Sequence, residues 1–244
     1  MSLYTIEKGK TKATISSLGA TVTNFQVGGQ EILFPQYWLN TDKARGGCPI
    51  CAPWFGQGKK EGDHYKHGYL RYREATKVTY TKSQAHFIFA RQGRAEYPWL
   101  VGYDMILYVA ENVFMMTLIV SRGKDGLASP APILPGFHPY FSCANAAEVK
   151  VKMLGEIQGG FSEKSRTIPI RDSKIDILMP GRTIEMFLLK GFQDSRSQLV
   201  LWSDNPGYAC IEPIMAERES FRAASGFYLN QGQSLEMQIG LAVY

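Results

Sequence analysis

The sequence of 244 residues predicts an all-β protein, a large and mostly antiparallel β-sandwich. Apolar residues often alternate with polar ones at a period of two, which is the pattern of strands with one buried face. The 24 glycines and 12 prolines gather between these apolar runs, so turns recur at short intervals. No long segment carries an apolar stripe at the helical period of about 3.6 residues. These observations favour layers of antiparallel strands packed around one core.

The strands expected from this pattern are distributed along the chain. They cover residues 20–27, 77–81, 85–91, 104–121, 149–153, 197–203 and 235–241. In the runs that begin at Val149 and Leu235, apolar residues alternate strictly with lysine, glutamate, glutamine or glycine. Within 104–121, Glu111 and Asn112 are suited to a tight turn, so this run predicts a β-hairpin.

A single domain spanning residues 1–244 is the simplest organisation. The length is in the range of one large β domain, and it suffices to bury a sizeable core. No repeat of fixed period, low-complexity linker or shift of composition marks a boundary within the sequence.

Composition and charge narrow the class of partner. Apolar residues make up 45% of the chain and charged residues 20%, and the net charge of +5 is spread along the sequence. Such a diffuse excess does not indicate a nucleic-acid partner. It is compatible with a phosphorylated or carboxylated small molecule held by local arginines, and also with an ordinary solvated surface.

The sequence also indicates the cellular compartment. Its first residues lack the basic start and apolar run of a secretory signal, and no stretch approaches the ~20 apolar residues that cross a bilayer. We therefore expect a cytoplasmic protein with no membrane partner. Four cysteines do not imply a disulfide framework. Cys48 and Cys51 form a Cys-x-x-Cys pair, but prolines surround it and no βαβ pattern carries it, so buried thiols are favoured over a redox dithiol.

Residues 39–71 are the exception to the strand pattern. A long irregular segment that is rich in polar and aromatic groups is often a binding loop. Its cationic, imidazole and large aromatic side chains include Arg45, Trp54, Phe55, Lys59, His64, His67 and Arg71. This segment is the first indication of a functional site.

Two histidines of this segment, His64 and His67, have carboxylates nearby, a combination that suits zinc or manganese. The His-x-x-His spacing has no matching pair elsewhere, and Lys66 adds a positive charge, so we expect no metal. Gly68 lets the backbone turn, which leaves His67 and Arg71 as donors for sugar hydroxyls or a phosphate. A solvated loop explains the same residues equally well.

One histidine and one glutamate occupy positions that the sequence predicts to be rigid or buried. His138 stands in "PGFHPYF", between a turn signal and three large or rigid residues. Glu212 lies in what resembles a buried strand end, where Pro213 stops the ladder and the carboxylate must be paired, hydrogen-bonded or neutralised. On these patterns alone, packed structural side chains explain both positions better than catalysis does. His86 is expected on the polar face of a strand.

The sequence lacks the usual catalytic signatures: Gly-x-Ser-x-Gly, the phosphate loop, the dinucleotide fingerprint and His-Glu-x-x-His. Hydrolase, kinase and dehydrogenase functions therefore lose their usual support. What remains is a β-rich domain with His138 and Glu212 in guarded positions and a loop of arginines and aromatics. Such residues could form an acid and base over a ring-shaped ligand.

Five motifs occur in an order that is informative as a set. They are "RGGCPICAPWFGQ" (45–57), "HGYLR" (67–71), "YPWLVGYDMILYV" (97–109), "FHPYF" (137–141) and "CIEP" (210–213). As an ordered set they resemble the galactose mutarotase-like superfamily, and within it most closely the glucose-6-phosphate 1-epimerase branch. The resemblance extends from about Arg45 to the C-terminus.

The resemblance implies a β-supersandwich, in agreement with the period-two pattern. It also implies an aldose 1-epimerase that acts on a hexose or hexose 6-phosphate. His138 would protonate the ring oxygen of the sugar, and Glu212 would take the proton from the anomeric hydroxyl. The ring then opens, the aldehyde rotates, and reclosure gives the other anomer. Because both steps are proton transfers, neither a metal nor an organic cofactor is expected.

The resemblance further assigns residues to substrate binding. They are His67, Arg45, Arg71, Trp54, Phe55 and Lys59. The two arginines and the lysine would face the phosphate, the histidine would hold sugar hydroxyls or the ring oxygen, and an aromatic ring would line the sugar pocket. We expect a small sugar or sugar phosphate as the partner, and a monomer or weak dimer.

The sequence departs from this superfamily at the position of a sugar-binding aspartate. Relatives carry an aspartate in a Thr-Asp-x-x-Tyr-like stretch that binds sugar hydroxyls, whereas the counterpart here, "RTIEMF", has Ile184 in its place. Glu185 and Asp176 are the carboxylates that could substitute. The missing aspartate motivates a second hypothesis, a non-catalytic carbohydrate-binding or sugar-sensing homologue of the same fold.

Overall fold

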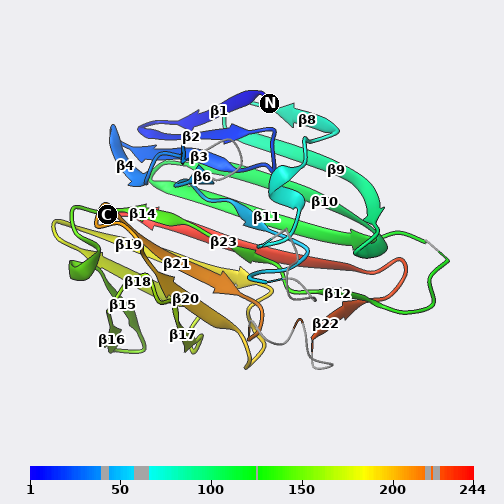
Figure 1. Cartoon of the computed structure of the whole chain (residues 1–244). Helices are drawn as coiled ribbons and strands as arrows, with labels where there is room; N and C mark the ends of the chain where they lie inside the picture. Colours follow the sequence, from blue (N-terminus) through cyan, green and yellow to red (C-terminus); the bar gives the residue numbers. More distant parts are fainter. Residues whose placement is uncertain (40–43, 58–65, 125, 218–220, 222–225) are drawn as a thin grey trace.

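The computed structural model describes residues 1–39, 44–57, 66–124, 126–217, 221 and 226–244. In this part of the chain the strands form one ten-stranded and one nine-stranded sheet, and all pairings between named strands are antiparallel (Figure 1). The all-β antiparallel fold expected from the sequence is confirmed.

The ten-stranded sheet has the order β1-β2-β3-β4-β14-β21-β13-β7, with β20 paired to β21 and β17 paired to β20. Its strands are β1 (Leu3–Lys8), β2 (Thr11–Ser16), β3 (Val22–Val27), β4 (Gln30–Leu33), β7 (Ile50–Cys51), β13 (Gly136–Phe137), β14 (Tyr140–Ser142), β17 (Arg166–Pro169), β20 (Gln198–Trp202) and β21 (Tyr208–Ile214).

The nine-stranded sheet has the order β16-β15-β18-β19-β23-β11-β10-β9-β8. Its strands are β8 (Lys77–Tyr80), β9 (Gln84–Arg94), β10 (Tyr97–Ala110), β11 (Val113–Arg122), β15 (Lys150–Met153), β16 (Glu156–Gln158), β18 (Lys174–Met179), β19 (Arg182–Lys190) and β23 (Ser234–Val243). Smaller elements are the pairs β5 (Tyr37–Trp38) with β6 (Ala44–Arg45) and β12 (Ala131–Ile133) with β22 (Phe227–Leu229), and the 3-10 turns η1 (Leu70–Tyr72) and η2 (Ala146–Glu148).

The two sheets bury a common core. Alternate residues of β10 and β11 are fully buried, as the period-two pattern requires of strands with one buried face. Phe25 of β3 and Phe114 of β11 lie with their ring centroids 4.8 Å apart, so the first and second sheets are in direct contact. The expected hairpin is confirmed, because β10 and β11 pair throughout and Asn112 in the turn has a positive φ of 58°.

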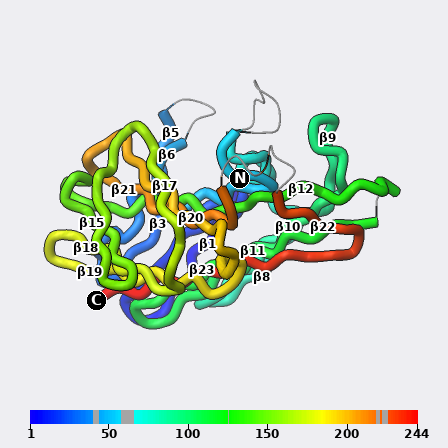
Figure 2. Tube along the Cα trace, turned by 90° about the horizontal axis from the view of Figure 1, so that it is seen from below, coloured from blue at the N-terminus to red at the C-terminus, as the bar shows by residue number. Residues whose placement is uncertain are grey.

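The C-terminal strand β23 lies inside the nine-stranded sheet, between β11 and β19. Figures 1 and 2 show β9 and β10 on one side of β23 and β15, β18 and β19 on the other. The ten-stranded sheet likewise joins β1 to β4 with β14 and β21. Both large sheets thus combine strands from distant parts of the sequence, and we propose on this basis that residues 1–244 form one domain.

Two sequence expectations outside the site can be compared with the structure. His86 lies on β9, where its Nε2 is 2.8 Å from Oδ1 of Asp104 on β10, in agreement with a polar strand position. Cys48 and Cys51 are buried free thiols, as expected. Among the residues that the structure describes, no helix has the length and apolar character needed to cross a membrane.

Gly68 fixes the path of the segment that enters η1. Its φ is +70°, and a Cβ there would lie 2.2 Å from the carbonyl oxygen of Ala52, with which it forms a parallel bridge. A side chain would therefore push His67 and Arg71, on either side of this contact, away from their positions.

We expect Gly68→Ala to lower the free energy of unfolding by more than about 2 kcal/mol, because backbone strain and a clash with Ala52 add together. The matched control is Gly28→Ala, since Gly28 also has a positive φ of 60° but has nothing within 4 Å of its added Cβ. That variant should lose only about 1–2 kcal/mol. Urea unfolding of both variants measures the difference, and equal losses would contradict the packing role.

Candidate active site

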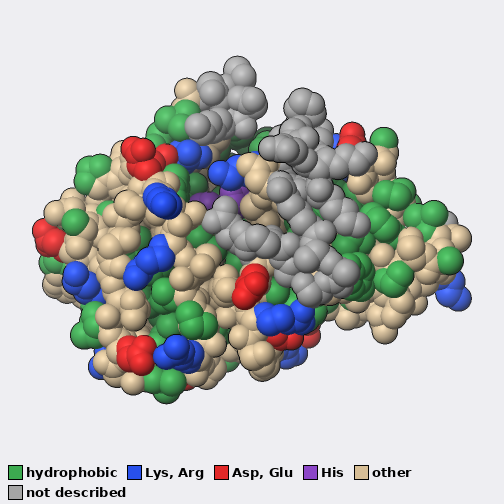
Figure 3. Space-filling model, turned by 60° about the horizontal axis from the view of Figure 1, so that its bottom comes forward, with side chains coloured by type: hydrophobic (Ala, Val, Ile, Leu, Met, Phe, Trp, Pro, Cys, Tyr) green, Lys and Arg blue, Asp and Glu red, His purple; other side chains and the backbone are tan. Residues whose placement is uncertain are grey.

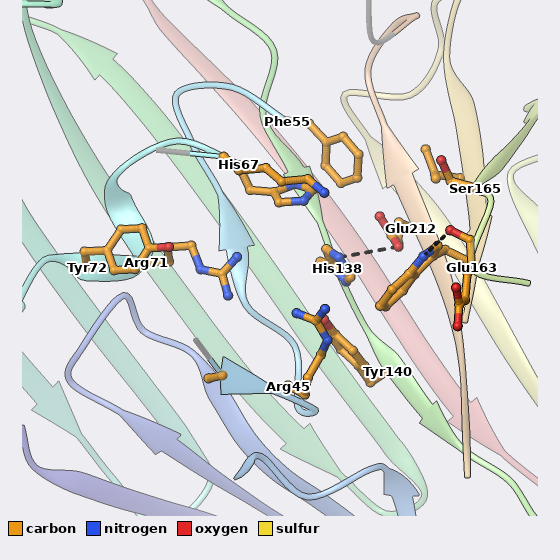
Figure 4. Close-up of a pocket in the computed structure, with 14 residues that line it drawn as sticks. Arg45, Phe55, His67, Arg71, Tyr72, His138, Tyr140, Glu163, Ser165 and Glu212 are labelled. Atoms are coloured by element: carbon orange, nitrogen blue, oxygen red, sulfur yellow. Dashed lines mark hydrogen bonds and ion pairs between the residues drawn. The ribbon is translucent and has the colours of Figure 1, made fainter. Parts of the chain in front are cut away.

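The pairing of β21 brings His138 and Glu212 together. On one side of β21, Tyr140 of β14 pairs with Cys210, and Gly136 of β13 pairs with Ile214. The two pairings have the same register, so His138, midway between them, lies opposite Glu212. Directly opposed side chains of antiparallel strands share one face of the sheet. Accordingly, Nε2 of His138 is 3.5 Å from Oε1 of Glu212, and both side chains are buried (Figure 4).

Alternation along these strands extends the polar and aromatic surface. Residues two apart on a strand point to the same side. Tyr140 is therefore next to His138, and the two rings stack at 4.8 Å with an interplanar angle of 11°. On β20, Val200 pairs with Glu212 and Trp202 pairs with Cys210. One face of three adjacent strands thus presents His138 and Glu212 with aromatic rings beside them.

These residues line a cavity of about 420 Å³. The described residues around it are Ala44, Arg45, Phe55, Lys66, His67, Arg71, Tyr72, His138, Tyr140, Glu163, Ser165, Val200, Trp202 and Glu212. Figure 3 shows histidine surface in a recess, next to lysine and arginine side chains. A cavity of this size falls in the range of small-molecule sites, about 300–1,000 Å³.

Arg45 enters the cavity from β6. Two residues later, Gly47 lets the backbone pass close to β3. Its φ is +67°, and a Cβ there would lie 2.0 Å from the carbonyl oxygen of Val22. The guanidinium donates from Nε and Nη2 to Oδ2 of Asp204, at 3.3 and 3.1 Å, and lies 5.2 Å from the ring centroid of Trp202. Burial opposes the charge of Arg45, but Tyr140 and Asp204 outweigh it and raise its pKa.

His67 and Arg71 reach the cavity from the turn that precedes η1 and from η1 itself. The backbone N–H of Gly56 donates to Nδ1 of His67 at 3.2 Å, so the neutral ring carries its proton on Nε2. The His67 ring is 5.2 Å from the His138 ring and 4.8 Å from that of Phe55. The Arg71 guanidinium lies 5.6 Å from the ring centroid of Tyr72.

The surroundings of His138 disfavour its charged form. Burial lowers the pKa of His138 well below its usual range, and the positive charges of Arg71, Arg45 and Lys66 lower it further. Within the described part of the chain, its Nδ1 is buried and has no hydrogen-bond partner. At neutral pH this environment therefore favours the neutral imidazole of His138.

The low pKa of His138 makes folding sensitive to acid. As the pH falls through about 6.5, the unfolded chain binds a proton on this ring that the folded chain does not, so stability falls with pH. The maximal slope from one such group is about 1.4 kcal/mol per pH unit. We expect His138→Gln to lose less stability than the wild type between about pH 7.5 and 5.5, as measured by urea unfolding. An identical loss in both proteins would show that His138 does not titrate in this way.

The structure brings most of the expected site residues into one cavity. Those that line it are Arg45, Phe55, His67, Arg71, His138 and Glu212. Lys59 lies outside the described residues. The sequence did not single out Lys66, Tyr72, Tyr140, Glu163, Ser165, Val200 or Trp202 as site residues. Alternation from His138 would have indicated Tyr140, whereas no local pattern points to Glu163 or Ser165.

Trp54, which was expected to bind the substrate, is not among the described residues that line this cavity. The residue is only 4% exposed, and its indole packs in the core against the rings of Tyr69, Tyr97 and Phe221. Neighbouring residues of an extended chain point to opposite sides. Phe55 faces the cavity, and Trp54 therefore faces the core.

The position of the missing aspartate lies in the other sheet. Ile184 on β19 is fully buried in the core. Glu185 is 2.5 Å from Nζ of Lys174 and accepts a hydrogen bond from the Tyr244 hydroxyl, and Asp176 also faces Lys174 at 3.6 Å. None of these residues is among those that line the cavity. Among the lining residues that are described, Glu163 and Glu212 carry carboxylates.

Cys210 lies beside His138 and Glu212, and the potential ligand atoms of the three residues are all within 4.8 Å of one another. A metal would require the Cys210 thiolate, because the thiolate and not the thiol is the ligand. Burial, together with the charge of Glu212, raises the pKa of Cys210 well above its usual range. The cost of deprotonating this buried thiol counts against a metal ion at these three residues.

Sequence comparison gives one family. The profile described as aldose 1-epimerase matches residues 2–174. No curated protein matches the chain.

Solved structures share the fold along the whole chain. A galactose mutarotase-related enzyme from Lactobacillus acidophilus has a TM-score of 0.81 at 16% identity, with 100% of this chain and 97% of the other covered. A galactose mutarotase-like protein from Lactobacillus casei has a TM-score of 0.75 at 14% identity, with 100% of both chains covered. A galactose 1-epimerase from Lactobacillus acidophilus has a TM-score of 0.70 at 10% identity, with 99% of this chain and 94% of the other covered. Such low identities establish the fold alone.

Proposed function

Because this chain belongs to the aldose 1-epimerase family, we propose that it interconverts the α and β anomers of a hexose or hexose 6-phosphate. The observation that carries the proposal is the His138–Glu212 pair, 3.5 Å apart on the wall of a sugar-sized cavity. Some of its structural neighbours are described as galactose mutarotase-like or galactose 1-epimerase. Those descriptions support a sugar substrate for this chain.

The proposed reaction needs one acid and one base that are close together. The ring oxygen and the anomeric hydroxyl are bonded to the same carbon, so the groups that serve them must be neighbours. His138 donates a proton to the ring oxygen while Glu212 removes the proton of the anomeric hydroxyl. The open aldehyde then rotates, and the reverse transfers close the ring as the other anomer. A positioned acid or base typically contributes about 10²–10⁴-fold.

A phosphorylated substrate is favoured by the charges of the cavity. Arg45, Lys66 and Arg71 line it. Arginine presents a planar set of N–H donors that suits phosphate oxygens. We therefore propose that the chain belongs to the hexose 6-phosphate branch of the family, with the arginines on the phosphate side. His67, with its proton on Nε2, is placed to donate to a sugar oxygen.

Magnetisation-transfer NMR tests the proposed function directly. The rate of exchange between anomers is measured for glucose 6-phosphate, glucose and galactose, with and without the protein. We expect acceleration above the buffer blank, and fastest exchange for the phosphorylated sugar. Rates equal to the blank for all three sugars would refute an epimerase with these substrates.

We expect Arg71→Ala to raise KM for glucose 6-phosphate by about 10–100-fold, because it removes a charge-assisted contact with the phosphate. KM for glucose should change by less than about threefold. The control is Arg171→Ala, which removes the same charge from an exposed ion pair with Glu156, outside the described cavity lining. Steady-state kinetics on both sugars measures this difference in KM. An equal rise of KM for the two sugars would assign Arg71 a structural role.

The buried position of Ile184 keeps a second function open for test, a carbohydrate-binding or sugar-sensing protein without turnover. In that case a sugar would bind measurably but its anomers would not exchange faster than in buffer. Binding would also be unchanged in Glu212→Gln. Calorimetric titration alongside the exchange measurement separates the two functions.

A further inference from the structure

The two arginines of the cavity differ in whether an acidic side chain pairs with them. Arg45 is paired with Asp204 through two hydrogen bonds. Arg71 makes no ion pair with any acidic residue in the described part of the chain, and its guanidinium contacts the ring of Tyr72. Among the described residues, Arg71 therefore adds a positive charge to the cavity without an acidic partner, whereas Arg45 forms an ion pair with Asp204.

The Arg45–Asp204 pair is held firmly by the turn between β20 and β21. The second carboxylate oxygen of Asp204 accepts a hydrogen bond from the Tyr208 hydroxyl. The hydroxyl of Ser203 donates to the carbonyl of Tyr208 at 2.9 Å, and the backbone N–H of Gly207 donates to Oδ1 of Asn205 at 2.8 Å. These bonds hold Asp204 in place beside Arg45, so the charge of Arg45 is compensated by the protein itself.

Among the described residues that line the cavity around His138, positively charged side chains outnumber negatively charged ones. Within the described part of the chain, the titratable and charged groups around it are Arg45, Cys48, Lys66, His67, Arg71, Tyr140, Cys210 and Glu212. Figure 4 shows the guanidinium groups of Arg45 and Arg71 pointing toward His138 from the side away from Glu212. Positive charge and burial together work against a proton on the imidazole.

The proposed mechanism requires that same imidazole to donate a proton to a sugar ring. A neutral imidazole is a very weak acid, so the proton must be acquired before the ring can open. Something that enters with the substrate has to change the charge balance. The group that does so must be negative and must lie close to Arg71.

We propose that the anionic group of the substrate is itself part of the catalytic apparatus: by pairing with Arg71 it offsets the positive charge that faces His138, and His138 then takes up the proton that it donates. This inference rests on the proposed function and deepens it, since the phosphate would activate the reaction as well as bind the substrate to the cavity. The proton comes from solvent when the substrate binds. It passes to the ring oxygen on opening and returns to His138 on closure, while Glu212 takes and returns the proton of the anomeric hydroxyl.

Proton uptake on anion binding tests the coupling without any turnover. Inorganic sulfate is the probe, because it is a dianion that does not titrate near neutral pH. Sulfate is titrated into the protein by calorimetry in two buffers of different ionisation enthalpy, near pH 7. We expect uptake of up to about one proton per bound sulfate, and tighter sulfate binding as the pH falls. Sulfate that binds without proton uptake, or does not bind, would overturn the proposal.

Three variants locate the proton and the charge. His138→Gln should bind sulfate with no proton uptake, and Arg71→Ala should lose both the binding and the uptake. Arg71→Lys keeps the charge and should retain uptake, which a purely structural role of Arg71 would not explain. Uptake that persists in His138→Gln would place the proton elsewhere and refute the role of His138.

Turnover of a neutral sugar gives a second, separate measurement. Phosphite dianion, added to glucose, should raise kcat/KM for anomer exchange by at least about fivefold in the wild type and not in Arg71→Ala. A protein that exchanges glucose anomers but does not respond to phosphite would overturn this inference while leaving the proposed function intact. A protein that exchanges no sugar would refute the proposed function, and the sulfate titration would still decide the coupling.

Discussion

Glu212→Gln is expected to lower kcat for anomer exchange by about 10²–10⁴-fold, because it removes the base and leaves a side chain of the same shape. Glu212 is only 2% exposed and lies in the centre of β21 between its two neighbouring strands. Glutamine fills the same space without a charge, so the strand pairing should persist. Magnetisation-transfer NMR with glucose 6-phosphate measures the loss.

The control for this variant is Glu236→Gln, which neutralises an exposed carboxylate that is ion-paired with Lys190 on the other sheet. It should retain wild-type exchange. Unfolding in urea and binding of glucose 6-phosphate establish that Glu212→Gln is folded and still takes up the sugar. A variant that binds the sugar and retains more than about a tenth of wild-type kcat would remove Glu212 from the role of base.

Several strands could be predicted from the sequence pattern, although β18 and β19, in which apolar and polar residues alternate, were not among the expected ranges. The hairpin of β10 and β11 is the clearest case, since the turn residues Glu111 and Asn112 lie between two long apolar runs. Residues 3–16, which form β1 and β2, were not among the expected strands. Their alternation is interrupted by lysines, threonines and glutamate, and their pairing with each other and with β3 stabilises them.

The site was only partly predictable for a different reason. His138 and Glu212 are brought together by the register of β13 and β14 on β21, and register between strands distant in sequence leaves no local pattern. The ordered motifs identified the pair through resemblance, whereas periodicity alone favoured a structural role. Glu163 and Ser165 reach the cavity from the loop before β17, where nothing in the sequence marks them. Trp54 was expected at the cavity because the motif does not tell which of the two neighbouring aromatic residues, Trp54 or Phe55, faces the cavity and which faces the core.

His138→Gln is expected to lower kcat for glucose 6-phosphate by about 10²–10⁴-fold, because glutamine can donate a hydrogen bond to the ring oxygen but cannot transfer a proton to it. The control is His86→Gln on β9, where the imidazole contacts Asp104 and is not among the described residues that line the cavity. That variant should keep wild-type exchange. Equal activity of the two variants would show that His138 is not the proton donor.

The pH dependence of this loss separates a proton donor from a packing residue. In the free protein, burial and the nearby arginines keep the pKa of His138 below its usual value, so only a small fraction of molecules carries the proton at neutral pH. The wild-type kcat/KM for glucose should therefore rise as the pH falls from about 8 to about 6, because more molecules hold the required proton. His138→Gln should show no such rise over the same range. A variant that retains the slope of the wild type would assign the titration to another group, and with it the acid that opens the ring.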